Sequence, residues 1–412
     1  MDVLGLRVVV SPGETALFCA FLAGGVTLGT VSGLTPGIHA NTFALLLAGA
    51  STAIPGPAVF VGAAMLAAGV VHTFLDVVPA LALGVPDAAM AHTALPGHRL
   101  VLAGQGREAL RLSALGSGGA VALAVPLAVP VTVAMERAYP WLSAHLPLVL
   151  ATVVVVLVAT ERGLFARVGA AVAVAASGAL GLATLDLPTG GLVDAGGMLA
   201  PLFTGLFGVP VLLDALGGEG IPEQASASVT TTGRELGRYT FAGTLSGAVV
   251  GYVPGVSSAV AATAALSTVP ESGARGFVVT TSGVNTANSV FALFALIALG
   301  SPRTGVLVAV EDAGVPMDLP VLLGAVVAGA AAGFVLVVSV GDWYLRRVGR
   351  LDYTRLCLSV LGLLVAVIGV LTGPLGVGVL AAASVVGLIP VWFGAKRATL
   401  MGVLLCPLIV QM

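Results

Sequence analysis

Apolar runs, each close to the thickness of a lipid bilayer, follow one another along almost the whole chain. A helix of about 20 apolar residues spans the hydrocarbon core. Only 9% of the 412 residues are charged, against about 25% in a soluble domain. We therefore expect an all-α, polytopic protein of the cell membrane with roughly 10–14 membrane segments. The apolar runs occupy residues 14–34, 54–84, 113–134, 146–160, 164–185, 195–213, 238–253, 280–300, 318–343, 356–373, 375–393 and 398–411.

Net charge and motif content exclude several classes of function. The net charge of −2 predicts no nucleic-acid partner. The sequence has no P-loop, no HExxH motif and no nucleophile elbow, so neither an enzyme nor an ATP-driven pump is expected. The three cysteines, Cys19, Cys357 and Cys406, lie inside apolar runs and are expected to be small core residues.

Arginine clusters fix the expected orientation. By the positive-inside rule, short arginine-rich loops face the cytoplasm. Counting spans from one cluster to the next places these loops on a single side. The clusters are Arg99/Arg107/Arg111, Arg162/Arg167, Arg234/Arg238, Arg346/Arg347/Arg350/Arg355 and Lys396/Arg397.

Two ordered motifs recur at nearly the same spacing. Gly25-x3-Gly29-x3-Gly33-x2-Pro36-Gly37 matches Gly243-x3-Gly247-x3-Gly251-x2-Pro254-Gly255, 218 positions later. The stretch 80–86 matches 296–302, 216 positions later. We therefore divide the chain into an N-terminal membrane repeat (1–217), a cytoplasmic linker (218–237) and a C-terminal membrane repeat (238–412).

Charge patterning predicts that the two repeats are inverted. The run 113–134 starts on the arginine-rich side, whereas its counterpart 318–343 ends there. Inverted repeats with interrupted helices in corresponding positions point to a secondary transporter and its binding site. In 34–54 and 255–280 the sequence does not distinguish a re-entrant hairpin from a crossing.

The Pro-Gly motifs are expected to interrupt helices beside a polar site. Proline ends a helix and glycine lets the backbone leave helical geometry. Inside a bilayer such backbone is tolerated only against protein or a water-filled cavity. A new helix N-terminus after each motif would suit an anion. The alternative is simple N-capping by the Asn, Ser and Thr residues. The candidate ligands here are Pro36, Gly37, His39, Asn41, Thr42, Pro254, Gly255, Ser257 and Ser258.

A second polar cluster enters the run that begins near residue 280. Amides and hydroxyls are costly inside a membrane unless they are used. We take Asn285, Thr286 and Asn288 as candidate substrate ligands. The alternative is that the cluster makes hydrogen bonds between helices.

His72 and Asp76 are candidates for the coupling ion. They are four residues apart and share a face if the segment is helical. An ionisable residue within a span is a functional candidate by default, so Asp76 would bind a cation or carry a proton, tuned by His72. The alternative is a local hydrogen bond near the membrane interface.

These motifs resemble the TctA family, the large membrane subunit of tripartite tricarboxylate transporters. The resemblance lies in Ser32–Thr42, in Gly251–Gly255 and in Asn285–Asn288 leading to Leu299–Pro302. The connector Phe74–Arg99 is more similar to the shorter, mainly archaeal branch. The motifs cover roughly 30–110 and 240–305, and the remainder is similar only in hydropathy.

The resemblance implies uptake of carboxylates coupled to a cation, with Na+ or H+ as the coupling ion and no other cofactor. It also implies a small membrane subunit and an extracytoplasmic solute-binding protein as partners, and it leaves a homodimer open. Carried over by position, the family motif places Pro36, Gly37, Asn41, Pro254, Gly255, Asn285 and Asn288 at the site.

Three functions stay open at this point. The first is a secondary transporter of a small organic anion, and the second is a polyprenyl-phosphate or other lipid-phosphate translocase. The third is a non-transporting membrane scaffold. A lipid carrier needs a lateral opening between helices, a solute carrier needs a closed polar cavity, and a scaffold needs neither.

Overall fold

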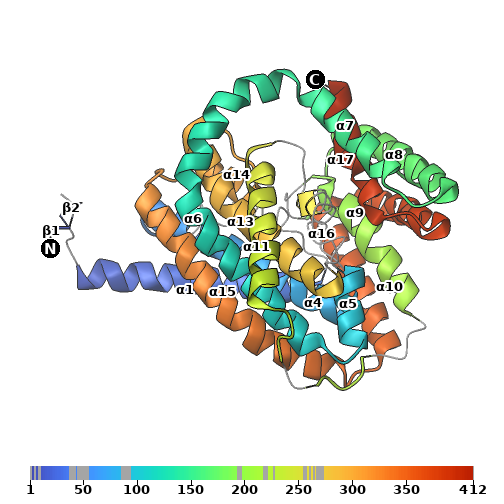
Figure 1. Ribbon diagram of the computed structural model, residues 1–412, viewed down its shortest axis with the longest axis horizontal. Helices are drawn as coiled ribbons and strands as arrows, with labels where there is room; N and C mark the ends of the chain where they lie inside the picture. Colours follow the sequence, from blue (N-terminus) through green and yellow to red (C-terminus); the bar gives the residue numbers. More distant parts are fainter. Residues whose placement is uncertain are drawn as a thin grey trace.

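The computed structural model describes residues 2–3, 6–7, 11–36, 43, 55–84, 94–192, 197–216, 221–225, 228–253, 258, 261–262, 265 and 273–411. These residues are almost entirely helical (Figure 1). Two short strands, β1 (Asp2–Val3) and β2 (Leu6–Arg7), pair near the N-terminus. The helices are α1 (Pro12–Leu34), α3 (Ala58–Leu75), α4 (Val77–Leu83), α5 (Ala94–Leu102), α6 (Gly106–Ala144), α7 (Leu146–Ala159), α8 (Leu164–Thr184), α9 (Leu199–Phe203), the π-helix η2 (Thr204–Gly208), α10 (Val209–Ala215), α11 (Gly233–Tyr252), α13 (Gly273–Leu299), α14 (Gly305–Asp312), α15 (Leu319–Val348), α16 (Tyr353–Phe393), the 3-10 helix η3 (Arg397–Met401) and α17 (Gly402–Gln411).

The expected membrane class is confirmed. Within the described residues, seven helices are long and apolar enough to cross a membrane. They are Pro12–Leu34, Ala58–Leu83, Gly106–Ala144, Leu164–Thr184, Gly273–Leu299, Leu319–Val348 and Thr354–Phe393. Shorter apolar helices lie at Leu146–Ala159, Leu199–Leu213 and Arg397–Gln411. Each predicted apolar run therefore coincides with a helix or a short group of helices.

The helix α16 contains two helices joined at Gly373. This residue has φ 72° and ψ −169°, outside the helical region, and Pro374 follows it. Ile368 and Leu380, from the two sides of the break, belong to one small buried cluster. In a straight helix their 12-residue separation would be about 18 Å. The break thus corresponds to the boundary predicted between 356–373 and 375–393.

The glycines of the first motif form the contact between α1 and α3. A Cβ at Gly25 would lie 2.2 Å from the Ala64 carbonyl oxygen, and one at Gly29 would lie 2.3 Å from that of Ala68. Likewise, a Cβ at Gly33 would lie 2.8 Å from Leu75 Cβ. Residue numbers rise together on both helices, so α1 and α3 are parallel. Only glycine permits this backbone approach.

The glycines of the second motif join α11 to α13 in the same way. Added Cβ atoms at Gly243 and Gly247 would lie 2.7 Å from the Thr280 carbonyl oxygen and from Ala287 Cβ. A Cβ at Gly251 would lie 2.7 Å from Phe291 Cβ. This pair is parallel as well.

A third helix joins each pair from the other half of the sequence. On α15, Gly329 and Gly333 face Ala67 and Phe74 of α3. On α6, Gly116 faces Val279 of α13. Each of these contacts is also parallel, whereas α6 and α15 are antiparallel to one another.

The antiparallel direction of α6 and α15 is seen in two contacts between them. Arg107 Nε donates to Asp342 Oδ1 at 2.6 Å, and a Cβ at Gly118 would lie 2.9 Å from Phe334. The triplet α1–α3–α15 therefore runs opposite to the triplet α11–α13–α6.

The parallel pairs decide how the chain passes between their helices. α1 ends beside Leu75, while α3 begins 17 residues earlier at Ala58, about 25 Å away along the axis. Likewise α11 ends beside Phe291, about 27 Å from the start of α13 at Gly273. The two ends of each connection lie at opposite ends of its helix pair. The stretches 34–54 and 255–280, for which the sequence allows either a re-entrant hairpin or a crossing, lie largely outside the described residues.

The remaining helices form a second lobe. Figure 1 shows α6 arching from the triplets toward α7, with α8, α16 and α17 grouped beyond it. α6 carries Pro126, Pro130 and Pro140 along this path. Its 39 residues are far longer than the predicted run 113–134. The charged stretch 96–111 is divided between α5 and the first turns of α6.

The short helix α5 packs through His98. Its Nδ1 lies 2.7 Å from the Leu81 carbonyl oxygen at the end of α4. Burial lowers the pKa of His98 from its ordinary value of 6.5, an effect that the hydrogen bond to Leu81 opposes. The folded protein thus favours the neutral imidazole.

We expect a change from Gly25 to Ala to destabilise the protein, because its new methyl group would overlap the Ala64 carbonyl. Overpacking of this kind costs about 1–3 kcal/mol. The adjacent Gly24→Ala is the matched control, since a Cβ there has nothing within 4 Å. Thermal unfolding in detergent should show a lower midpoint for Gly25→Ala only. Equal midpoints would contradict the close α1–α3 packing.

A second prediction concerns pH. The unfolded chain takes up a proton on His98 near pH 6.5, but the folded chain does so only at lower pH. This contribution to stability is therefore present above pH 6.5 and is lost as the pH falls toward the folded pKa. Thermal midpoints measured from about pH 8 to pH 5 should fall less steeply for His98→Gln than for the parent chain. Identical slopes would rule out a contribution from His98.

Candidate functional site

Asp76 and Asn285 meet where α3 crosses α13. The Asn285 amide Nδ2 donates to Asp76 Oδ2 at 2.8 Å. Both side chains are about 95% buried. Asp76 lies at the junction of α3 and α4, inside a span 26 residues long. The contact therefore joins the central helices of the two triplets inside the membrane-spanning part of the molecule.

Hydroxyl groups surround this crossing. Thr73 Oγ1 and Thr286 Oγ1 are 3.3 Å apart across the same two helices. Thr286 donates to Ser117 Oγ on α6 at 2.9 Å. Ser117 in turn donates to the Ser282 carbonyl at 3.1 Å. Ser113 and Ser282 pair through their hydroxyls at 2.9 Å. Hydroxyl groups of three helices are thus joined in one network of hydrogen bonds.

His72 anchors α1 next to the first Pro-Gly motif. Its Nδ1 lies 2.9 Å from Ser32 Oγ, and its ring stacks on Phe43 at 5.8 Å between centroids. The imidazole is fully buried. His72 and Asp76 share one face of α3, as expected. Each of them has a partner on another helix, Ser32 for His72 and Asn285 for Asp76.

The first Pro-Gly motif is only partly described. α1 ends at Leu34, and Pro36 follows in a buried turn. In the second motif, Val253 is the last described residue before Pro254 and is also buried. Ser258 is 6% exposed. The other candidate ligands after these motifs lie outside the described residues, namely Gly37, His39, Asn41, Thr42, Pro254, Gly255 and Ser257.

Asn288 is a candidate ligand with an unpaired hydrogen-bond acceptor. Its Oδ1 atom is buried and has no hydrogen-bond partner among the described residues. It lies on α13, less than one turn beyond Asn285. A buried amide oxygen without a partner is costly, and a bound solute or water would remove that cost. Thr286, in contrast, makes the interhelical hydrogen bonds that the alternative interpretation of this cluster predicted.

The network residues on α1 and α6 were not predicted from the sequence. Ser32, Ser113 and Ser117 hold polar contacts of α1 and α6. Ser113 and Ser117 are four residues apart in an otherwise apolar run, which places both on one helix face. That spacing could have indicated a polar stripe. The sequence contains no comparable indication for Ser32, because a lone serine in a membrane helix is common.

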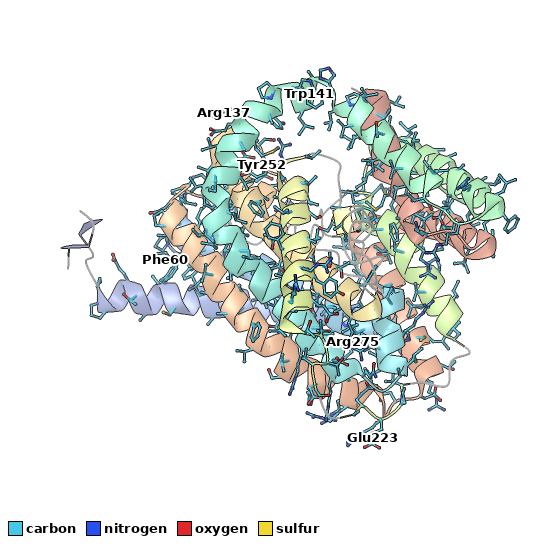
Figure 2. All side chains as sticks on the ribbon, viewed as in Figure 1. Phe60, Arg137, Trp141, Glu223, Tyr252 and Arg275 are labelled. Carbon is cyan, nitrogen blue, oxygen red and sulfur yellow. The ribbon has the colours of Figure 1, made fainter. Side chains whose placement is uncertain are left out.

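The other end of the α6–α13 contact carries an ion pair. Arg275 Nε and Nη2 donate to the two carboxylate oxygens of Glu108, each at 2.9 Å. Thr230, in the linker between the halves, donates to Glu108 through its N–H and hydroxyl. Figure 2 shows Arg275 and Tyr252 at opposite ends of the α11–α13 pair. The linker is thus fixed to α6 beside the start of α13.

The polar crossing lies among helices long and apolar enough to span a membrane, so the fold and the site define a polytopic membrane protein. The chain belongs to the TctA family, described as the tripartite tricarboxylate transporter TctA family, whose model matches residues 19–402. It is therefore a transporter membrane subunit and not an enzyme, and the resemblance found in the motifs is confirmed. Membership also implies association with other subunits and a solute-binding protein.

A curated relative comes from Methanocaldococcus jannaschii, where it is described as an uncharacterized protein. It is 25% identical over 348 residues, which are 82% of this chain and 83% of the relative. No solved structure matches the chain.

Replacing Asn285 tests the contact with Asp76. Asn285→Asp would set two carboxylates against each other, so one of them must take up a proton. We expect Asn285→Asp to lower the thermal midpoint more than Asn285→Ala near neutral pH. The difference should shrink on acidification, because a shared proton can replace the lost N–H donor. A difference that does not change with pH would contradict the Asp76–Asn285 contact.

Proposed function

We propose that this protein is an ion-coupled secondary transporter of a small organic anion, most closely a carboxylate. The observation that carries the proposal is the buried crossing of α3 and α13, where Asp76 meets Asn285. A carboxylate held between two central helices is suited to binding a cation, either Na+ or H+. Asn288, less than one turn away, has an amide oxygen that is unpaired in the described part of the chain and that would coordinate the cation or accept a hydrogen bond from a hydroxyl group of the solute.

The opposed triplets support an inverted repeat. α1, α3 and α15 run in one direction, and α11, α13 and α6 run in the other. Arg107 and Asp342 join the start of α6 to the end of α15, and by the positive-inside rule this shared end would face the cytoplasm. In transporters, two such repeats enclose the substrate at their interface. The interface here is the α3–α13 crossing.

The solute would be bound by neutral donors and helix ends on the side of Asn288, while the cation neutralises Asp76. The transporter would work with a small membrane subunit and an extracytoplasmic solute-binding protein that delivers the anion. In this arrangement His72 positions the first Pro-Gly motif and lies four residues from Asp76. Removal of either partner of the cation–anion pair should weaken binding of the other.

Binding screens separate the candidate substrates. The purified protein is heated with dicarboxylates, tricarboxylates, inorganic anions or polyprenyl phosphate, each with and without Na+ and at two pH values. The proposal expects a raised thermal midpoint with a carboxylate that depends on Na+ or on pH. Stabilisation by polyprenyl phosphate alone would support the lipid-phosphate alternative. Stabilisation by none of these ligands would contradict a solute carrier.

Two substitutions test the assigned residues in reconstituted vesicles. Asp76→Asn and Asn288→Ala should each lower uptake by roughly tenfold or more, because hydrogen bonds to charged groups contribute about 1.5–3 kcal/mol. Both variants should still insert and keep a thermal midpoint near that of the parent.

One control repeats the change from Asp to Asn at another position, and the other truncates a different polar side chain to alanine. Asp342→Asn alters a carboxylate at the end of α15, and Ser339→Ala removes an exposed polar group on that helix. Uptake should be retained in both. Full uptake by Asp76→Asn or Asn288→Ala would remove that residue from the site.

A further inference from the structure

Tyr252 is the last residue of α11 and is fully buried. Its Oη lies 2.5 Å from Thr132 Oγ1 on α6. Thr132 uses its own hydroxyl hydrogen toward the Ala128 carbonyl at 2.6 Å. Since a hydroxyl has one hydrogen, Tyr252 is the donor and Thr132 the acceptor in this pair.

Each partner lies two residues from a proline. Tyr252 precedes Pro254 of the second Pro-Gly motif, and Thr132 follows Pro130 of α6. Proline removes a main-chain donor and weakens the helix around it. The hydrogen bond between Tyr252 and Thr132 therefore joins the end of α11 to the part of α6 that follows Pro130. Val253 N–H still donates to the Val249 carbonyl at 2.8 Å, so the helix continues up to the motif.

α6 holds the α11–α13 pair at both ends. Glu108 binds Arg275 near one end, and Thr132 binds Tyr252 near the other. The 24 residues between Glu108 and Thr132 correspond to about 36 Å of helix. Between these points, Gly116 and Gly119 bring α6 against Val279 and Thr240. This stretch of α6 therefore contacts the α11–α13 pair along most of its length.

The first motif lacks this contact. At the motif spacing of 218, the counterpart of Tyr252 is Leu34, which has no hydroxyl. In the first half, a hydrogen bond between Ser32 and His72 joins α1 to α3. The Tyr252–Thr132 bond is thus not a general requirement of the glycine-packed fold. It is a specific feature of the second half.

We propose that Tyr252 is a positioning residue: its hydroxyl, held by Thr132, fixes the end of α11, from which the chain enters the second Pro-Gly motif. The proposal rests on the proposed function in one respect, namely that this motif borders the anion site. Loss of the hydroxyl should loosen the last turn of α11 and weaken anion binding, while the buried ring keeps the fold intact.

The test compares Tyr252→Phe and Thr132→Val with Tyr239→Phe. Tyr239 is a buried tyrosine on the same helix and serves as the matched control. Hydrogen exchange of the segment Val249–Val253 should be about three- to tenfold faster in the first two variants, the factor expected for one hydrogen bond. The double variant Tyr252→Phe/Thr132→Val should show no further increase, because both changes remove the same bond.

Uptake in vesicles supplies the second readout, using the carboxylate that stabilises the parent protein. Tyr252→Phe should raise KM with little change in kcat, and Tyr239→Phe should change neither. Unchanged exchange in Tyr252→Phe overturns the proposal outright. Faster exchange with an unchanged KM overturns the positioning role and leaves a purely structural bond. If the parent transports no carboxylate, the proposed function fails, and the exchange data still decide whether Tyr252 holds the helix end.

Discussion

Polar groups placed inside a bilayer must be satisfied by the protein itself, and the core of this structure depends on that constraint. Asp76 cannot face lipid, so α3 must bury it against another polar helix. Asn285 provides the partner, and the hydroxyls of Thr73, Thr286 and Ser117 complete the surroundings. The crossing of α3 and α13 is therefore fixed by polar contacts, whereas the packing on either side of it is fixed by glycine.

The two triplets are related but not equivalent. Glycine stripes bring α1 onto α3 and α11 onto α13 in the same parallel sense, and a helix from the other half completes each triplet. Polar contacts then differ between the halves. Arg275 pairs with Glu108 at the start of α13 in one triplet, while Val315 packs on Gly62 at the start of α3 in the other. Such asymmetry would let the two halves share one architecture and still hold different parts of a transport site.

Much of this arrangement could be predicted from the sequence, and the reasons are physical. Apolar length fixes where helices form, and the repeated Gly-x3-Gly spacing indicates which helix faces meet. The direction of each pair could not be predicted, because a glycine stripe supports parallel and antiparallel packing equally. His72 and Asp76 were found by charge, but their partners on α1 and α13 depend on tertiary contacts that local pattern does not contain.

The most direct test is a crosslink at the crossing itself. Thr73 and Thr286 are replaced by cysteine in a chain whose Cys19, Cys357 and Cys406 are alanine, with a protease site inserted between Leu216 and Ile221. After oxidation in native membranes and cleavage, the two halves should migrate together on a denaturing gel and separate on reduction. The control pair Thr73→Cys/Ile297→Cys, with Ile297 exposed near the end of α13, should separate without reduction. Separation of the Thr73/Thr286 pair under the same oxidation would show that α3 and α13 do not meet at this point, and the account of the site would be wrong.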